Sequence, residues 1–172
     1  MSVLSIIELP DERLRQISAA VDSFDQPLAE LIDNLFETLA HHGGIGLCAP
    51  QVGVLRRVLV IHVPDDNYGA HAYVNPEILA KAAPGLVEES CLSVPGVEGN
   101  VIRSTRVHIR AQDRSGEFFE AQVDGMHAVC LQHEIDHLEG RLFIDRLSWF
   151  KKLRLRLQAA RAARAKNRLI AG

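Results

Sequence analysis

Two histidines four residues apart carry the clearest chemical signal in this sequence. His133 and His137 flank Glu134 in the segment QHEIDH, residues 132–137. On a helix, residues four apart lie on one face, so both imidazoles can reach a single metal ion. Glu134 is then about 100° round the helix, where it could take a proton from metal-bound water without being a ligand. The pattern predicts a hydrolytic metal site.

A plainer alternative for these residues is a surface helix that carries two histidines and two acids. Helical spacing argues against it, because His133 and His137 continue a stripe that starts with Met126, Val129 and Cys130. A mostly apolar stripe of this kind is typical of a helix face that points into the core. We therefore expect both histidines to point inward.

Two histidines do not complete a catalytic metal site, and no histidine follows them in the chain. An HExxH endopeptidase would need a third ligand downstream, and Glu139 falls on the wrong side of the helix. Upstream, Cys91 lies in the segment EESCLSVPG, and one thiolate with two imidazoles leaves one coordination position open, as catalytic sites require. The alternative for Cys91 is a small buried residue, which we also expect of Cys48 and Cys130.

The composition is that of an ordinary globular protein, with 47% hydrophobic and 24% charged residues among 172. We expect one domain without a signal peptide or membrane span. Three widely spaced cysteines are a poor disulfide framework, which favours the reducing cytoplasm. The net charge of −3 hides an asymmetry, since eight basic residues and no acid lie from residue 150 to the end. The rest of the chain is therefore strongly acidic.

Hydrophobic spacing predicts three helices. Apolar residues recur at helical intervals across 25–44, where Asp25 fits an N-cap, Pro27 falls in the first turn and two glycines end the run. The segment 125–140 places the two histidines between flanking glycines. A last helix is expected from about 148 to 168, where Ala, Leu, Arg and Lys dominate and proline is absent.

Four strands are expected between the helices. The runs 57–63 and 72–78 have strand-like composition, and the second should end at its proline, Pro76. The runs 107–113 and 117–124 flank the residues RSG, a hairpin signal with glycine where the turn needs it. Strands grouped before a helix, with hairpins instead of regular βαβ alternation, predict an α+β fold.

Three motifs together resemble those of the peptide deformylase family, in the order and spacing of that family. They are GIGLCAPQ at 44–51, EESCLS at 88–93 and QHEIDHLEGRLFIDR at 132–146. The LPDERLRQ segment near the start fits as well. The resemblance implies antiparallel or mixed sheets around the central HExxH helix, followed by a C-terminal helix. It implies a catalytic domain over 1–150, with 151–172 as a basic helical extension of that domain.

The resemblance implies a metal-dependent hydrolase that removes the formyl group from the N-terminal methionine of new polypeptides. Cys91, His133 and His137 match the metal ligands of the family, and Glu134 matches its catalytic glutamate. The family uses Fe²⁺, for which Zn²⁺, Ni²⁺ or Co²⁺ can substitute, whereas ligand chemistry alone leaves zinc and ferrous iron open. Glu134 would accept a proton from water and deliver it to the leaving amine.

The resemblance also implies which groups surround the reacting amide. The side-chain amide of Gln51 and the backbone N–H of Leu92 would stabilise negative charge on the former carbonyl oxygen, and one such donor is worth roughly 3 kcal/mol. A polar loop residue is the alternative for Gln51. Ile45, Val129 and Cys130 would line the methionine pocket. The expected substrate-binding residues are Ile45, Gly46, Ser90, Glu98, Val129 and Cys130.

Two positions depart from the family pattern. Ser90 replaces a glycine whose backbone helps to hold the substrate, so its side chain could narrow the cleft. Glu98 stands where an arginine is common, which reverses a charge beside the cleft. Neither position is an expected metal ligand, so we expect the chemistry to persist, and Glu98→Arg should raise kcat/KM on formyl-Met peptides.

The basic segment 151–172 has two interpretations. It could be a solvated terminal helix, or it could bind ribosomal RNA, because each neutralised phosphate releases counterions. Some members of the family contact the ribosome through a C-terminal helix, which favours the second. The expected partners are N-formylmethionyl nascent peptides and the ribosome or its RNA, with no membrane and a monomeric state.

Two other functions stay open on the sequence. An HExxH endopeptidase is disfavoured by the missing downstream ligand and by the EESCLS segment. A deformylase-like protein with altered specificity, or a ribosome-associated binding module without turnover, is supported only by Ser90 and Glu98.

Overall fold

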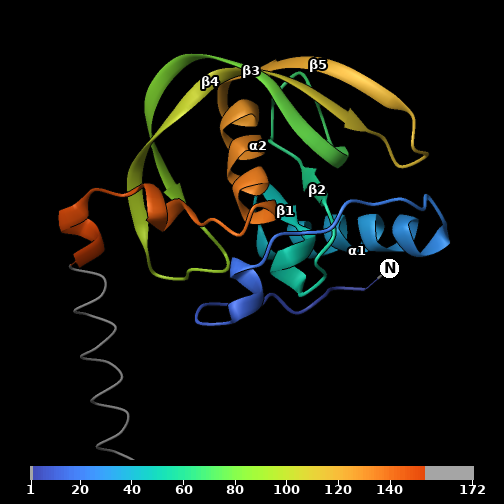
Figure 1. Ribbon diagram of the computed structural model, residues 1–172, viewed down its shortest axis with the longest axis horizontal. Coiled ribbons are helices and arrows are strands. Elements are labelled where there is room, and N and C mark those ends of the chain that lie inside the picture. The colour runs from blue at the N-terminus through green and yellow to red at the C-terminus, as the bar shows by residue number, and fades with distance from the viewer. Residues whose placement is uncertain (1, 154–172) are drawn as a thin grey trace, which may run out of the picture.

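The computed structural model describes residues 2–153, in which two long α-helices accompany five β-strands (Figure 1). The elements are α1 (Gln26–His42), β1 (Gly46–Cys48), β2 (Val58–Ile61), β3 (His71–Ser90), β4 (Glu98–Gln112), β5 (Phe118–Asp124) and α2 (Gly125–Leu138). Short 3₁₀ turns lie at Glu12–Arg15, Ala49–Val52 and Phe143–Arg146. The predicted α+β class is confirmed.

The strands form one sheet in the order β1-β2-β3-β4-β5, and every neighbouring pair is antiparallel. Figure 1 shows α2 at the centre of the molecule, with β3, β4 and β5 curving over it and α1 beside β1 and β2. The predicted hairpin is confirmed, since β4 and β5 pair around a turn in which Gly116 has a φ of 92°.

Strand β2 lies between the two helices, which explains its continuous apolar sequence. Leu59 and Ile61 pack in the cluster that contains the buried face of α2, whereas Val58 and Val60 pack in the cluster that contains α1. All four residues of β2 are buried. A strand covered on both faces loses the alternation of polar and apolar residues that marks a strand with one wet face.

Helix α1 has the boundaries that its sequence predicts. The Asp25 side chain accepts a hydrogen bond from the backbone N–H of Leu28 at 3.2 Å, which caps the first turn. Gly43 ends the helix in the left-handed conformation, with a φ of 66°. The chain then turns directly into β1, which carries the GIGLCAPQ motif to the centre of the molecule.

The expectation that the strand at 72–78 ends at Pro76 is wrong. Strand β3 spans 20 residues from His71 to Ser90 and passes through Pro76, because a register shift against β4 between Val74 and Glu77 absorbs the proline. Asn75 adopts a positive φ of 50° at this bulge. The resulting long hairpin of β3 and β4 brings Ser90 opposite Glu98 and delivers Cys91 to the side of α2.

Helix α2 is buried over most of its length. Val129, Cys130, His133 and His137 face inward as expected, each with at most 9% of its surface exposed. Met126 does not share this environment, because 46% of its surface is exposed at the start of the helix. The buried stripe therefore begins one turn later than its sequence pattern suggests.

Residues 149–153 are helical, as expected for the start of the last helix. The remainder of that predicted helix lies outside the described residues, so the separate extension at 151–172 stays a prediction. Within residues 2–153, the helices are too short or too polar to traverse a lipid bilayer.

Candidate active site

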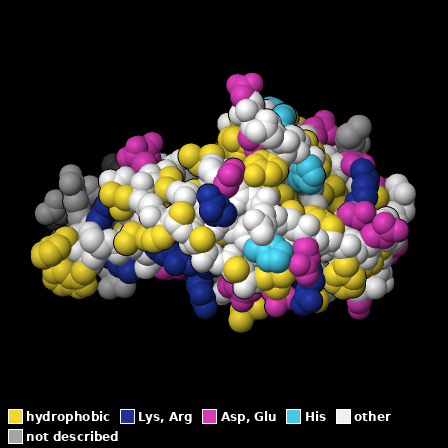
Figure 2. Space-filling model, turned by 90° about the horizontal axis from the view of Figure 1, so that it is seen from above, with side chains coloured by type: hydrophobic (Ala, Val, Ile, Leu, Met, Phe, Trp, Pro, Cys, Tyr) yellow, Lys and Arg dark blue, Asp and Glu magenta, His cyan; other side chains and the backbone are white. Residues whose placement is uncertain are grey.

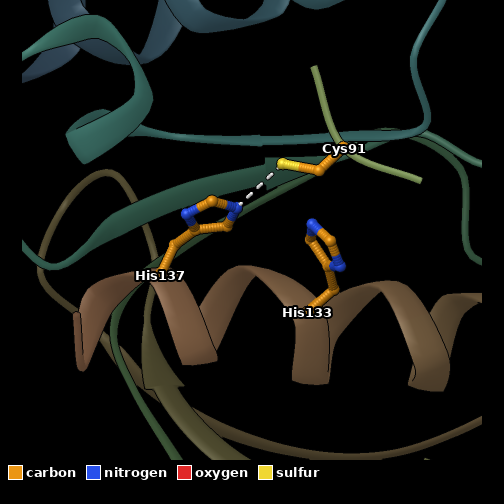
Figure 3. A group of neighbouring side chains, drawn as sticks. All are labelled: Cys91, His133 and His137. Atoms are coloured by element: carbon orange, nitrogen blue, oxygen red, sulfur yellow. Dashed lines mark hydrogen bonds between the residues drawn. The ribbon is translucent and has the colours of Figure 1, made fainter. Parts of the chain in front are cut away.

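The three side chains expected to bind metal lie together between β3 and α2. Cys91 follows the last residue of β3, and His133 and His137 point toward it from successive turns of α2 (Figure 3). Their candidate ligand atoms all lie within 4.8 Å of one another, and all three residues are buried. The Sγ atom of Cys91 is 3.3 Å from Nε2 of His137, close to the spacing of two ligands on one ion held at about 2.3 and 2.0 Å.

A buried carboxylate orients His133. The Nδ1 atom of His133 lies 2.8 Å from Oε2 of Glu89, which leaves Nε2 to face the sulfur of Cys91. Glu89 in turn accepts two hydrogen bonds from Arg103, at 2.6 and 3.0 Å. Carboxylates in this position fix the tautomer and ring orientation of a metal-binding histidine.

The hydrogen bonds that orient His133 continue into a network of ion pairs behind it. Arg103 also donates to Asp136 at 2.5 Å, and Arg146 donates to both carboxylate oxygens of Asp136 at 2.6 Å. Arg103 and Asp136 are buried, so each charge requires the partners that surround it. Strand β4, helix α2 and the following 3₁₀ turn are thereby tied together next to His133 and His137.

The two histidines differ in their affinity for protons. Burial lowers the pKa of His133, but hydrogen bonds to Cys91 and Glu89 outweigh it and raise the pKa to about 10. Burial and the neighbouring charge of His133 lower the pKa of His137 well below its usual value. His133 is therefore the more basic of the two rings.

These features fit a divalent cation. One sulfur and two imidazole nitrogens form the three-ligand set of catalytic sites. Nδ1 of His137 is buried without a hydrogen-bond partner among the described residues, so Nε2 is the nitrogen that meets the other ligands. The Cys91, His133 and His137 group could therefore hold a metal ion.

Glu134 lies beside this group and lines the same cavity. Its Oε2 atom is buried and lacks a hydrogen-bond partner among the described residues. Burial raises the pKa of Glu134, and the charge of His133 opposes this effect. A carboxylate with a raised pKa and a free oxygen can accept and return a proton, which is the role predicted for it.

Gln51 also reaches the cluster, from the turn that follows β1. Its Nε2 atom is 3.7 Å from Sγ of Cys91 and 3.3 Å from Oγ of Ser93. Its Oε1 atom accepts a hydrogen bond from the backbone N–H of Cys48 at 3.0 Å, so the amide orientation places NH₂ toward the cluster. Gln51 is buried. Its predicted role as an oxyanion donor stays a prediction, as does that of Leu92, which lines the same cavity.

All six expected substrate-binding residues line one cavity of about 620 Å³, which Cys91, His133 and Glu134 also line. Its size is within the range of small-molecule and peptide-terminus sites. Val129 and Cys130 form a buried wall one turn before His133, whereas Ser90 and Glu98 are exposed at the opening. The expected set of residues is therefore brought together, although the individual contacts with a substrate stay predictions.

Gly46 is required by close packing at this cavity. A Cβ atom at this position would lie 2.3 Å from Sγ of Cys130 and 2.8 Å from Oε1 of Glu134. Any larger residue must displace one of these two side chains. The absence of a side chain thus lets β1 approach the face of α2 that carries Cys130 and Glu134.

The site is supported from behind by Glu89, Arg103 and Asp136, for which the sequence pattern predicts no role. One signal for Arg103 was available, because Arg103 has the same strand parity as the buried Val101. An arginine on the inward face of a strand needs buried carboxylates. The identity of those carboxylates depends on the pairing of β3 with β4 and on the packing of α2, which spacing alone does not give.

Comparison with known proteins places these features in a family. Residues 3–153 match the family model described as polypeptide deformylase. A curated peptide deformylase of Hahella chejuensis is 48% identical over 157 residues, which cover 91% of this chain and 94% of that protein. A peptide deformylase of Chromobacterium violaceum is 44% identical over 156 residues, which cover 91% and 93%.

Solved structures agree with the sequence matches. The crystal structure of a peptide deformylase from Legionella pneumophila superposes with a TM-score of 0.86 at 43% identity, covering 96% of this chain and 98% of that one. The Met-Ala-Ser-bound enzyme from Acinetobacter baumannii gives 0.80 at 33% identity, covering 84% and 98%. With the fold, the length and the sequence all in agreement, this chain belongs to the polypeptide deformylase family.

Proposed function

We propose that the protein hydrolyses the formyl group from the N-terminal methionine of newly made polypeptides. Water adds to the formyl carbon, the C–N bond breaks, and formate and a free methionine amine are released. The observation that carries this proposal is the buried cluster of Cys91, His133 and His137, with the unpartnered Oε2 of Glu134 in the cavity that Cys91 and His133 line. Membership of the deformylase family supports it independently.

Cys91, His133 and His137 would hold the metal ion. When bound, a divalent cation supplies Lewis-acid chemistry, which activates water and polarises the formyl carbonyl at neutral pH. Fe²⁺ is the proposed ion, with Zn²⁺, Ni²⁺ or Co²⁺ able to replace it. A donor set of one thiolate and two imidazoles suits these softer transition metals better than Mg²⁺ or Ca²⁺.

Glu134 moves the proton. Its carboxylate takes a proton from the attacking water and returns it to the amine nitrogen, since an amide anion is too basic to leave. Its burial supports this role, because burial raises the pKa of Glu134 toward the operating pH. A carboxyl group whose pKa is near the operating pH can both accept and release a proton. The Nε2 of Gln51 and the backbone N–H of Leu92 would donate hydrogen bonds to the developing oxyanion.

The methionine side chain would occupy the buried wall of the cavity. Ile45, Val129 and Cys130 line that wall, and the Cys130 thiol stays neutral because burial raises its pKa well above its usual value. The peptide backbone would run along Gly46, where β1 exposes its edge, and past Ser90 toward Glu98.

We also propose that residues 1–150 form the catalytic domain and that 151–172 are a basic extension of it that contacts the ribosome. The concentration of basic residues in that segment supports electrostatic binding to RNA. The protein would act as a cytoplasmic monomer. Its three free, buried cysteines agree with a reducing compartment.

The decisive experiment uses formyl-Met-Ala-Ser with enzyme loaded with Fe²⁺ under anaerobic conditions, beside a blocked peptide without a formyl group. Formate release from the first peptide alone supports the proposal. Internal cleavage of the second peptide would indicate an endopeptidase. Binding of either peptide without any product would indicate a binding module.

A further inference from the structure

Three exposed acids and the exposed His42 line the outer part of the cavity. Glu8, Glu88 and Glu98 line it, and each of the three is exposed. Within residues 2–153, lysine and arginine are absent from its lining, and none of the three acids forms an ion pair. Their charges are therefore available to a ligand that enters the cavity.

Some acids elsewhere on the surface are paired with basic side chains. Over β3–β5, acidic and basic side chains are interspersed (Figure 2), and Arg110 pairs with Glu77 at 2.7 Å. Deeper in the cavity, the charge of Glu89 is matched by Arg103 and His133. Glu8, Glu88 and Glu98, named the acidic rim, form a local concentration of acids. The amine of Lys151 lies beside Gly99, whose position on β4 faces the opposite side of the strand from Glu98.

The acidic rim lies where the residues after the substrate methionine would pass. Glu98 pairs with Ser90, which directly precedes Cys91. Antiparallel partners have Cα atoms about 5 Å apart and chain neighbours about 4 Å apart, so Glu98 lies within about 10 Å of Cys91. An extended peptide covers that distance in about three residues. Glu88 projects from the same face of the hairpin, two residues before Ser90.

The inner part of the cavity differs from its rim in polarity and burial. The inner wall is apolar and buried, with Val129 and Cys130 each at most 5% exposed. Glu134 projects its unpartnered Oε2 near the cluster, which marks the reacting end. A peptide held with its formyl group there has its following side chains at the rim, where cationic groups would be attracted and anionic groups repelled.

We propose that the acidic rim makes this enzyme selective for formyl-Met peptides with lysine or arginine among the next three residues. This inference rests on the proposed deformylase activity. Glu98 and Glu88 are the specificity-determining residues, and Glu8 adds to the field from the N-terminal segment that lines the cavity. Because the acids are exposed, the preference is expected to be about tenfold at low ionic strength and to shrink as salt is added.

The test compares peptides that differ only in one charge. Formyl-Met-X-Ser and formyl-Met-Ala-X, both amidated at the C-terminus, are assayed for formate release with X as lysine, glutamine or glutamate. Enzymes are the wild type, Glu88→Gln, Glu98→Gln and the double variant. Glu117→Gln serves as the matched control, because Glu117 is an exposed acid outside the cavity.

For the wild type and the control, kcat/KM should be highest on the lysine peptide, intermediate on the glutamine peptide and lowest on the glutamate peptide. The ratio of kcat/KM on the lysine peptide to that on the glutamate peptide should be near tenfold at low salt. The double variant should reduce that ratio to about twofold, whereas Glu117→Gln should leave it near the wild-type value. Equal rates for the three peptides, or a ratio that survives in the double variant, would overturn the inference alone. Release of no formate from any peptide would overturn the proposed function and this inference with it.

Discussion

His133 and Glu89 form a hydrogen bond of 2.8 Å between Nδ1 and Oε2, so the imidazole that faces Cys91 is held by a carboxylate from the neighbouring strand. Replacing Glu89 by glutamine keeps the shape of the side chain but removes its charge. We expect metal affinity to fall about tenfold to a hundredfold, as is typical when a partner of a ligating histidine is changed. Competition with a coloured chelator measures this directly.

The control for this prediction is Glu117→Gln, which removes the same charge far from His133. Thermal unfolding of both variants separates a loss of metal affinity from a loss of structure. An unchanged affinity in folded Glu89→Gln enzyme would mean that Glu89 does not orient the ligand.

Gly46→Ala tests the close approach of β1 to α2. The added methyl group would lie 2.3 Å from Sγ of Cys130 and 2.8 Å from Oε1 of Glu134. We expect destabilisation of about 1–3 kcal/mol from overpacking, together with a larger loss in kcat than in metal content, because Glu134 must move. Gly69→Ala is an instructive comparison, since its neighbourhood is open and only its positive φ of 71° opposes a side chain. Full activity in Gly46→Ala would contradict this geometry.

The pH dependence of stability should reflect His127 and Asp66. Burial lowers the pKa of His127, which is hydrogen-bonded to Tyr73 at 2.7 Å and to Asp66 at 2.8 Å. The folded state thus binds fewer protons than the unfolded state, so the stability present above pH 6.5 is lost as pH falls toward the folded-state pKa. The free energy of unfolding should decrease between pH 7 and pH 5.

His127→Gln should flatten that decrease, because it removes the group that titrates. Denaturant unfolding of wild-type and variant proteins at matched metal content measures the two slopes. An identical slope in His127→Gln would assign the pH dependence to other groups.

The fold was predictable where local signals were strong. The Asp25 cap, the Gly43 stop and the Arg-Ser-Gly turn each define a boundary through nearby residues, and the structure confirms all three. The course of β3 was not predictable in this way, because Pro76 normally ends a strand. It is tolerated here through a bulge whose other half belongs to β4, more than 30 residues away in the chain.

In the candidate site too, features set by nearby residues were predictable and features set by tertiary packing were not. The spacing of His133 and His137 on one helix predicts their shared direction, and the motif resemblance adds Cys91. The buried partners of these ligands were missed, because Glu89, Arg103 and Asp136 come from three elements whose contacts depend on tertiary packing. Charged residues in such a network look like ordinary surface residues until the strand register is known.

Removal of residues 154–172 tests the proposed ribosome contact without altering the described residues. Six of the eight basic residues in the terminal segment lie there, so binding that depends on phosphate neutralisation should weaken and lose part of its salt dependence. Co-sedimentation with ribosomes at low and high salt measures the effect. Activity on short formylated peptides should be retained, and equal ribosome binding by the shortened chain would refute the contact.

The central claim is that Glu134 transfers a proton beside a metal ion held by Cys91, His133 and His137. The most direct test measures metal content and formate release together, for the wild type and for Glu134→Ala. The account predicts about one metal ion per chain in both proteins, with formate release reduced by about a hundredfold or more in the variant. Undiminished formate release from metal-loaded Glu134→Ala would contradict it.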